Sequence, residues 1–339
     1  MHQLKINFLL LILLGSFLAC KNEPSGTSTG NDTTITVEAP TVPRFNRDSA
    51  YAYIQKQVDF GPRVPGSAAH QACKEWIVAK MESFGTKVSQ QDFEATIFNG
   101  QTLPGTNIFA QINPQSTQRL LFGAHWDSRI VADSPLSTER QDEAVLGADD
   151  GASGVGILME LARLLAQDSS LDIGIDIVFF DIEDNGANGN NGLQDTWALG
   201  AQYWSRNLPY GATKPEYGIL LDMVGAKGAR FALEGYSMQY APNIVDKIWK
   251  LAGYLGYSNY FVNQRGGQIT DDHLYVNTIA RIPMIDIINQ QPNTPSTPSG
   301  FGAHWHTHND DMDIIDKATI RTVGKLLVEV IYREDAGLL

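Results

Sequence analysis

The sequence predicts an α/β fold in which helices flank both faces of one mixed, mainly parallel central sheet. Short apolar runs typical of buried strands alternate along the chain with segments of helical periodicity. The chain has 339 residues, of which 43% are apolar, so it can bury a large core. Polar and acidic residues recur directly after the apolar runs, at the edge where parallel sheets bind their ligands.

The first predicted elements are two helices, residues 47–61 and 67–85, joined by the turn-rich segment GPRVPGS. The spacing of the second helix places four residues on one face: Ala69, Cys73, Ile77 and Met81. Cys73 is therefore expected to be a buried structural thiol rather than a nucleophile.

The rest of the predicted fold consists of four strands and two further helices. The strands are QRLLFGAHWDS, which ends at His125, then LDIGIDIVFFD, YGILLDMVGA and IPMIDII. The helices are GASGVGILMELARLLAQ and, at the end of the chain, DKATIRTVGKLLVEVIYRE. Strands that alternate with helices favour parallel pairing, with both faces of the sheet covered. We expect a single folded domain over residues 43–339.

The N-terminal segment predicts export. Residues 1–19 combine Lys5 with the apolar run INFLLLILLGSFLA, and Ala19 precedes Cys20, as in bacterial lipoprotein signals. An ordinary secretory signal is the alternative. Residues 20–42 are rich in Ser, Thr and Gly and are expected to be a flexible tether. The predicted protein is lipid-anchored at Cys20 to a bacterial membrane and faces the periplasm or the cell surface.

The net charge of −13 argues against a general nucleic-acid-binding protein, which would need a basic surface. No long exposed apolar stripe calls for a protein partner, so we expect a monomer. Membrane contact is expected only through the anchor. Because Cys73 is the only cysteine after Cys20, the body has no internal disulfide.

Several residues after the strands are of the types that bind zinc, which takes imidazole nitrogen and carboxylate oxygen in a tetrahedral shell. The candidates are His125, Asp150, Glu183, Asp184, Asp222 and His306. Glu183 and Asp184 are adjacent, and two such charges repel unless a cation lies beside them or one of them holds a proton.

Each candidate also has a purely structural interpretation. His125 can be a hydrogen-bonded histidine at a strand end, and Asp150 can be the N-cap of the helix that follows it. The Glu183–Asp184 pair can belong to a solvated loop, since NGANGNNG follows it. Asp222 lies in so apolar a strand that a paired or functional role is favoured.

The C-terminal histidines His304, His306 and His308 alternate, so they share one face if the segment is extended. Their spacing alone does not tell which of them binds a metal ion. The combined pattern is stronger than its parts, because independent structural roles would have to coincide at one edge of one sheet.

Four motifs resemble the successive motifs of the zinc aminopeptidase superfamily: LLFGAHWDSR, GADDGASGVGILMELARLL, IVFFDIED and LLDMVGA. Within that superfamily, DDHLYVNTIARIPMIDII and HWHTHNDDMDIID resemble glutaminyl-peptide cyclotransferases, and NGLQDTWALGAQYW resembles their bacterial branch. The likeness runs from Phe45 to the C-terminus. The order and spacing of the motifs make it specific, and it implies the zinc aminopeptidase-like fold.

The resemblance implies that three residues bind one Zn²⁺ ion per chain: Asp150, Asp184 and His306. It implies that Glu183 is the general acid–base and that Asp222 and Asp271 complete a hydrogen-bond network around the substrate amide. It also implies that Trp305 walls the substrate pocket. Trp126 and Trp197 are further candidates for the pocket wall, although each can equally be a packing residue.

Two positions depart from the family pattern. The second acidic residue of the pair is often Glu, and here it is Asp184, which is one methylene shorter but still an oxygen ligand. Asp286 stands where the animal cyclases have a histidine that pairs with the residue matching Asp271. Two carboxylates there need a shared proton or an intervening water.

The resemblance implies an enzyme that converts the N-terminal Gln of peptides or proteins to pyroglutamate and releases ammonia. The main alternative is a two-zinc aminopeptidase, in which His125 and Asp222 join a second metal ion and Asp150 bridges the two. A catalytically inactive peptide-binding lipoprotein on the same fold is the other alternative. The presence of Glu183 and His306 argues against it.

Overall fold

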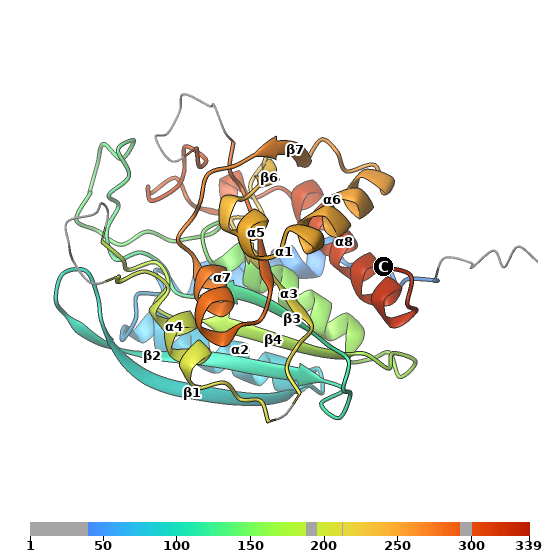
Figure 1. The fold of residues 1–339 in the computed structure, drawn as a ribbon. Helices are drawn as coiled ribbons and strands as arrows, with labels where there is room; N and C mark the ends of the chain where they lie inside the picture. The colour runs from blue at the N-terminus through green and yellow to red at the C-terminus, as the bar shows by residue number, and fades with distance from the viewer. Residues whose placement is uncertain (1–39, 188–194, 212, 292–299) are drawn as a thin grey trace, which may run out of the picture. The chain divides into compact units, whose positions relative to one another are not determined.

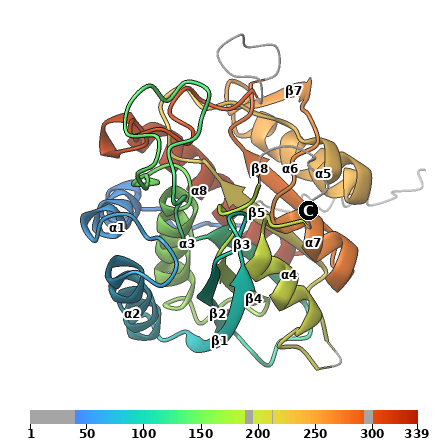
Figure 2. The ribbon, with the colours of Figure 1, turned by 90° about the vertical axis from the view of Figure 1, so that its left-hand side faces the viewer.

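The computed structural model describes residues 40–187, 195–211, 213–291 and 300–339 (Figure 1). A six-stranded sheet lies at the centre, and helices cover both of its faces (Figure 2). This confirms the predicted mixed, mainly parallel α/β fold. Residues 1–39, which hold the predicted signal and most of the predicted tether, lie outside the described residues.

The strand order across the sheet is β1-β2-β4-β3-β5-β8. The strands are β1 Lys87–Thr96, β2 Thr102–Ile112, β3 Arg119–His125, β4 Gly174–Phe180, β5 Tyr217–Asp222 and β8 Met284–Ile288. Strands β4, β3, β5 and β8 run parallel, whereas β1 and β2 form an antiparallel hairpin at one edge. The hairpin was not predicted from the sequence. Phe93 is the only buried residue of the edge strand β1, so its apolar pattern is weak.

Side chains alternate between the two faces of the central strands, and each set joins a different part of the core. Leu120 and Phe122 of β3 face the layer formed by four helices, whereas Leu121 faces the opposite side with Trp204. The four helices are α1 Arg47–Asp59, α2 Ala68–Ser83, α3 Ala152–Leu165 and α8 Lys317–Asp335. On the opposite side lie α4 Leu199–Arg206, α7 Asp272–Tyr275 and the π-helical turn Val276–Ala280.

A second, two-stranded parallel sheet lies beyond β8. It is formed by β6 Phe231–Leu233 and β7 Phe261–Arg265, and the helices next to it are α5 Gly235–Tyr240 and α6 Pro242–Tyr254. A short 3₁₀ turn, Met312–Ile314, precedes α8. These elements were not predicted individually.

Cys73 is fully buried in the core, as predicted. Among the described residues, no helix combines the length and apolar character needed to cross a membrane.

The register of the sheet determines which polar residues meet. Parallel pairing places His125 of β3 beside Phe180 of β4, and Asp222 of β5 beside Ile288 of β8. The strands therefore end at a common edge. The segment after β4, which carries Glu183 and Asp184, begins at the same edge, as the sequence predicted.

Candidate metal centre and active-site pocket

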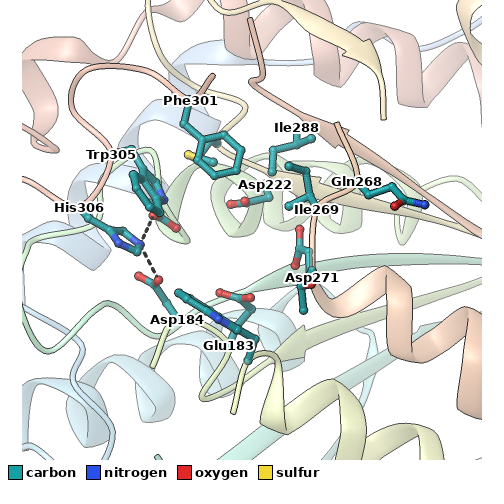
Figure 3. A pocket seen from close by; sticks show the side chains of 14 residues that line it. Glu183, Asp184, Asp222, Gln268, Ile269, Asp271, Ile288, Phe301, Trp305 and His306 are labelled. Carbon is teal, nitrogen blue, oxygen red and sulfur yellow. Dashed lines mark hydrogen bonds and ion pairs between the residues drawn. The ribbon is translucent and has the colours of Figure 1, made fainter. Parts of the chain in front are cut away.

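A pocket of about 220 Å³ opens at the carboxyl edge of the parallel strands. Figure 3 shows His306 and Asp184 pointing toward each other, with Glu183 next to Asp184. The polar lining residues include Asp150, Glu183, Asp184, Asp222, Asp271 and His306, and the apolar ones include Trp197, Met223, Ile269, Ile288, Phe301 and Trp305.

Three of these residues, Asp150, Asp184 and His306, converge on one point. His306 Nε2 lies 2.8 Å from Asp184 Oδ1 and 3.6 Å from Asp150 Oδ2. Ligands at about 2.0–2.1 Å in a tetrahedral zinc shell lie about 3.3 Å apart, which falls between these two distances. Asp184 Oδ2 is buried and has no hydrogen-bond partner in the described part of the chain. The donor set and this orphan oxygen fit a zinc ion.

The acidic pair is positioned by a strained turn and by a third carboxylate. Ile182, directly before the pair, has φ = 51°, which is rare for a β-branched residue and costs conformational energy. Asp127 accepts the backbone N–H groups of Glu183 (3.1 Å) and Asp184 (3.3 Å). The two side chains are thereby fixed at the start of the loop rather than solvated in it.

Asp150 is not the N-cap of α3, so the purely structural role considered for this residue from the sequence is wrong. The cap is Gly151, with φ = 98° and no side-chain cap hydrogen bond. A Cβ at Gly151 would lie 2.7 Å from the Asp127 carbonyl oxygen, so only glycine fits there. The buried Asp310 accepts the N–H groups of Asp149 (2.7 Å) and Asp150 (3.1 Å), which leaves the Asp150 carboxylate to face the pocket.

The three C-terminal histidines do not share a face, because the chain turns at His306, where φ = 53°. His304 contacts Asp149 (2.9 Å), and the half-buried His308 contacts the carbonyl oxygen of Arg140 (3.0 Å). Only His306 reaches the converging carboxylates. The tertiary structure thus selects the histidine that the alternating pattern left open.

A second carboxylate holds the other ring nitrogen of His306. Nδ1 lies 3.2 Å from Asp133 Oδ1, and Arg129 donates two hydrogen bonds to Asp133, at 2.7 and 2.6 Å. Burial would lower the pKa of His306, but the charge of Asp184 and the contacts with Asp133 and Asp184 raise it to about 9. A carboxylate behind a metal-binding histidine orients the ring and increases its basicity.

A second group of possible metal ligands lies beside the first and shares Asp150 with it. His125 Nε2 lies 3.0 Å from Asp150 Oδ1 and 3.2 Å from Asp222 Oδ1, and His125 Nδ1 lies 3.5 Å from Asp127 Oδ1. Burial lowers the pKa of His125, but these three carboxylates raise it well above its ordinary value. Asp222 is therefore paired, as its apolar strand predicted.

Glu183 lines the pocket beside the converging trio but is not one of its members. Burial raises the pKa of Glu183 well above its ordinary value, and the charges of Asp271, Asp272 and Asp184 raise it further, whereas His125 lowers it. A carboxyl group in this environment can hold a proton near neutral pH and can also release it.

Asp271 reaches the pocket, with Asp286 behind it. Asp271, Asp286 and His273 form a buried group whose ligand atoms lie within 4.8 Å of one another. Burial and the charge of Asp271 raise the pKa of Asp286 well above its ordinary value. This direction favours the protonated form of Asp286, in keeping with the expectation that two carboxylates at these positions share a proton. Glu234 anchors the other side of His273 at 3.0 Å.

Aromatic side chains wall the pocket next to His306. The ring centroids of Trp305 and His306 are 3.8 Å apart in a stacked pair, and Trp197 stacks on His306 at 6.3 Å. The prediction that Trp126 lines the pocket is wrong. Trp126 is fully buried, stacks on His70 at 4.1 Å and donates its indole N–H to the carbonyl oxygen of Thr106.

Several residues that position the site were not predicted to have a role in it: Asp127, Arg129, Asp133, Asp149 and Asp310. Asp127 follows the β3 strand at the same edge as His125, and Asp149 directly precedes the candidate ligand Asp150. Their positions in the sequence were therefore weak indications of a role in the site. Nothing in the sequence distinguished Arg129, Asp133 or Asp310 from ordinary loop residues.

The sequence profile of peptidase family M28 matches residues 107–331, which is more than half of the chain. The chain belongs to peptidase family M28. A glutaminyl cyclase from Porphyromonas gingivalis is 48% identical, with a TM-score of 0.81 over 86% of this chain and 99% of that one. A Zn-dependent exopeptidase from Parabacteroides distasonis is 46% identical, with a TM-score of 0.82 and the same coverage.

The similarity extends to curated animal proteins. The glutaminyl-peptide cyclotransferase of Gloydius blomhoffii is 26% identical over 296 residues, which cover 78% of this chain and 75% of that protein. The predicted resemblance to the glutaminyl cyclase branch of the zinc aminopeptidase superfamily is confirmed.

Proposed function

We propose that this family member is a glutaminyl-peptide cyclotransferase that closes the N-terminal Gln of peptides or proteins to pyroglutamate and releases ammonia. The observation that carries the proposal is the position of Glu183. It is a buried carboxyl group with a raised pKa beside a set of three zinc-type ligands, yet it is not one of them. The sequence relatives named glutaminyl cyclases support the same activity.

We assign one zinc ion to Asp150, Asp184 and His306, and bound zinc would polarise the γ-carbonyl of the substrate as a Lewis acid. Glu183 then takes a proton from the α-amine, whose nitrogen attacks the γ-carbon and closes a five-membered ring. Glu183 returns that proton to the departing amide nitrogen, and ammonia leaves. Proton transfer by a positioned side chain contributes about 10²- to 10⁴-fold to such a rate.

The remaining pocket residues hold one substrate conformer, which matters because the attack is intramolecular. Asp222 and Asp271 line the pocket beyond Glu183 and can accept hydrogen bonds from the substrate amide and amine. Trp305, Ile269 and Phe301 supply apolar walls. A volume of about 220 Å³ suits one side chain better than an extended peptide, so the rest of the substrate would lie outside.

The two-zinc aminopeptidase remains the second candidate, because His125, Asp150 and Asp222 also converge. A relative described as a Zn-dependent exopeptidase is consistent with it. We favour one zinc ion because Oδ2 of Asp184 in the His306 group is buried without a hydrogen-bond partner among the described residues, whereas Asp150 and Asp222 both contact His125 directly, at 3.0 and 3.2 Å.

The deciding experiment is incubation of the zinc-loaded protein with Gln–Ala and Leu–Ala dipeptides. A cyclotransferase releases ammonia from Gln–Ala without free Gln and leaves Leu–Ala intact. Free amino acids from either dipeptide would identify a peptidase instead. No reaction with either dipeptide would refute both.

We also propose that the enzyme acts outside the cytoplasm, anchored through a lipid on Cys20. The support is the N-terminal sequence pattern. Exported proteins with a free N-terminal Gln would then be its substrates. Metabolic labelling with a fatty acid analogue checks the anchor, because Cys20→Ala would abolish the label.

A further inference from the structure

A second cavity, of about 420 Å³, lies at the N-terminal end of α1, away from the active-site pocket. Four of its seven lining residues are arginines, although the chain carries a net charge of −13. The lining residues, which we call the arginine pocket, are Arg44, Phe45, Asn46, Arg47, Asp48, Arg163 and Arg321.

Two acidic side chains in this region are already neutralised by other partners. Glu160 is fully buried and pairs with Arg163, at 2.7 Å to both of its oxygens. Asp48 pairs with Lys317 at 2.8 Å. Over the described residues, the side chains of Arg44, Arg47 and Arg321 make no hydrogen bond or ion pair. Three guanidinium groups therefore remain available around one cavity.

The surrounding elements extend this positive surface. Lys317, Arg321 and Lys325 are spaced four residues apart on α8 and so lie on one side of that helix. Arg44, Arg321 and Lys325 are exposed. Figure 2 shows α1 and α8 on the same flank of the sheet.

The arginine pocket is well separated from the active site. Arg163 is near the end of α3, whereas Asp150 directly precedes the start of that helix. The 13 positions between them correspond to about 20 Å along the helix axis. A lipid headgroup bound at the arginines therefore does not enter the active-site pocket.

We propose that the arginine pocket docks the folded body onto a membrane by binding the phosphates of anionic lipid headgroups. Arginine binds phosphate oxygens through two parallel N–H donors, and each basic residue near an anionic surface adds to the attraction. The overall negative charge does not prevent this, because salt screens charges more than about 10 Å away.

The position of the arginine pocket along the chain favours a membrane, rather than an acidic protein, as the binding partner. Arg44 lies where the chain enters the folded body, and Cys20 lies 24 positions before it. If residues 20–42 form the tether predicted from the sequence, a chain of that length spans about 25–30 Å on average. If Cys20 carries the lipid proposed above, the anchor holds these arginines within reach of the headgroups.

The test is sedimentation of the unlipidated body, residues 40–339, with lipid vesicles. Residues 39–339 form one compact unit of the chain, and solved relatives that match 86% of this chain are themselves covered to 99%. We expect binding to vesicles containing phosphatidylglycerol, weak binding to pure phosphatidylcholine, and loss of the difference at high salt. Arg44→Glu combined with Arg47→Glu should weaken binding at least tenfold, as should Arg321→Glu combined with Arg47→Glu.

The matched control is Lys87→Glu combined with Lys227→Glu, which changes the net charge equally at two exposed lysines outside the arginine pocket. It should bind vesicles like the wild type. Equal binding by control and pocket variants, or no preference for the anionic vesicles, would overturn the proposal. So would stronger binding to a soluble polyglutamate peptide than to vesicles. An unchanged circular dichroism spectrum and melting temperature confirm that the pocket variants fold. Because neither this control nor vesicle binding needs catalysis, the test fails or succeeds independently of the proposed activity.

Discussion

Two histidine–carboxylate groups lie side by side in this molecule and share Asp150, yet their surroundings differ. His306 faces Asp184 and Asp150 through one ring nitrogen and is held from behind by Asp133. His125 has Asp150 and Asp222 at one nitrogen and Asp127 near the other. Neighbouring carboxylates raise the pKa of both histidines, that of His306 to about 9 and that of His125 well above its ordinary value.

The difference shows that residue types alone do not decide how many metal ions bind. A histidine must lose its proton before it can coordinate a metal. In the His306 group, Oδ2 of Asp184 is buried and has no hydrogen-bond partner among the described residues, so a cation could bind there. In the His125 group, Asp150 and Asp222 both contact the ring directly, at 3.0 and 3.2 Å. We therefore expect a zinc ion at the His306 group and a buried ion-pair network at the His125 group, although both contain the same ligand types.

The largest expected effect separates the two histidines. His306→Ala should reduce zinc content from about one per chain to nearly none and abolish turnover, because one of three protein ligands is lost. His125→Ala should retain about one zinc per chain. Metal analysis after dialysis measures both. A wild-type content of two zinc ions that falls to one in His125→Ala would show that the two groups are alike.

The next largest effect is expected at Glu183, which lies beside the three proposed zinc ligands but is not one of them. Glu183→Gln should keep the fold and the zinc ion but lower turnover of Gln–Ala by about 10²- to 10⁴-fold, because the amide cannot shuttle a proton. Steady-state ammonia release measures this loss. Glu139→Gln, at an exposed loop position, is the control and should be unchanged. Wild-type turnover in Glu183→Gln would remove Glu183 from the mechanism.

A smaller effect is expected behind His306. Asp133→Asn should weaken zinc binding by about 10- to 100-fold, since an amide orients the ring without its negative charge. Competition with a chromophoric chelator measures the affinity. Asp142→Asn, an exposed carboxylate in the same loop, serves as the control. If both variants bind zinc like the wild type, Asp133 has no influence on the metal centre.

The smallest effect is a pH dependence of zinc binding. The pKa of about 9 in the metal-free site means that His306 is protonated at neutral pH and must release that proton when zinc binds. Zinc affinity should therefore rise with pH, by roughly tenfold per unit between pH 6 and pH 8. Titration calorimetry in buffers of different ionisation enthalpy measures the proton release. An affinity independent of pH would contradict the assigned protonation state.

Most of the parallel sheet was predictable because its strands are buried on both faces and appear as continuous apolar runs. The strands ending at His125 and Asp222 were identified in this way, as was the strand before Asp181. The β1–β2 hairpin was missed because its edge strand is mostly exposed. Trp126 was misplaced because a strand-end aromatic looks the same in sequence whether it turns toward the pocket or into the core.

The order of strands, helices and acidic motifs along the chain determined by itself that carboxylates and histidines would gather at one edge of a parallel sheet. That follows from local patterning, since apolar runs become strands and parallel strands end together. Only the tertiary structure decided that His306 rather than His304 or His308 meets Asp184, and that His125 is enclosed by three carboxylates. Those outcomes depend on positive-φ turns and on contacts between residues up to 173 positions apart, which no local pattern encodes.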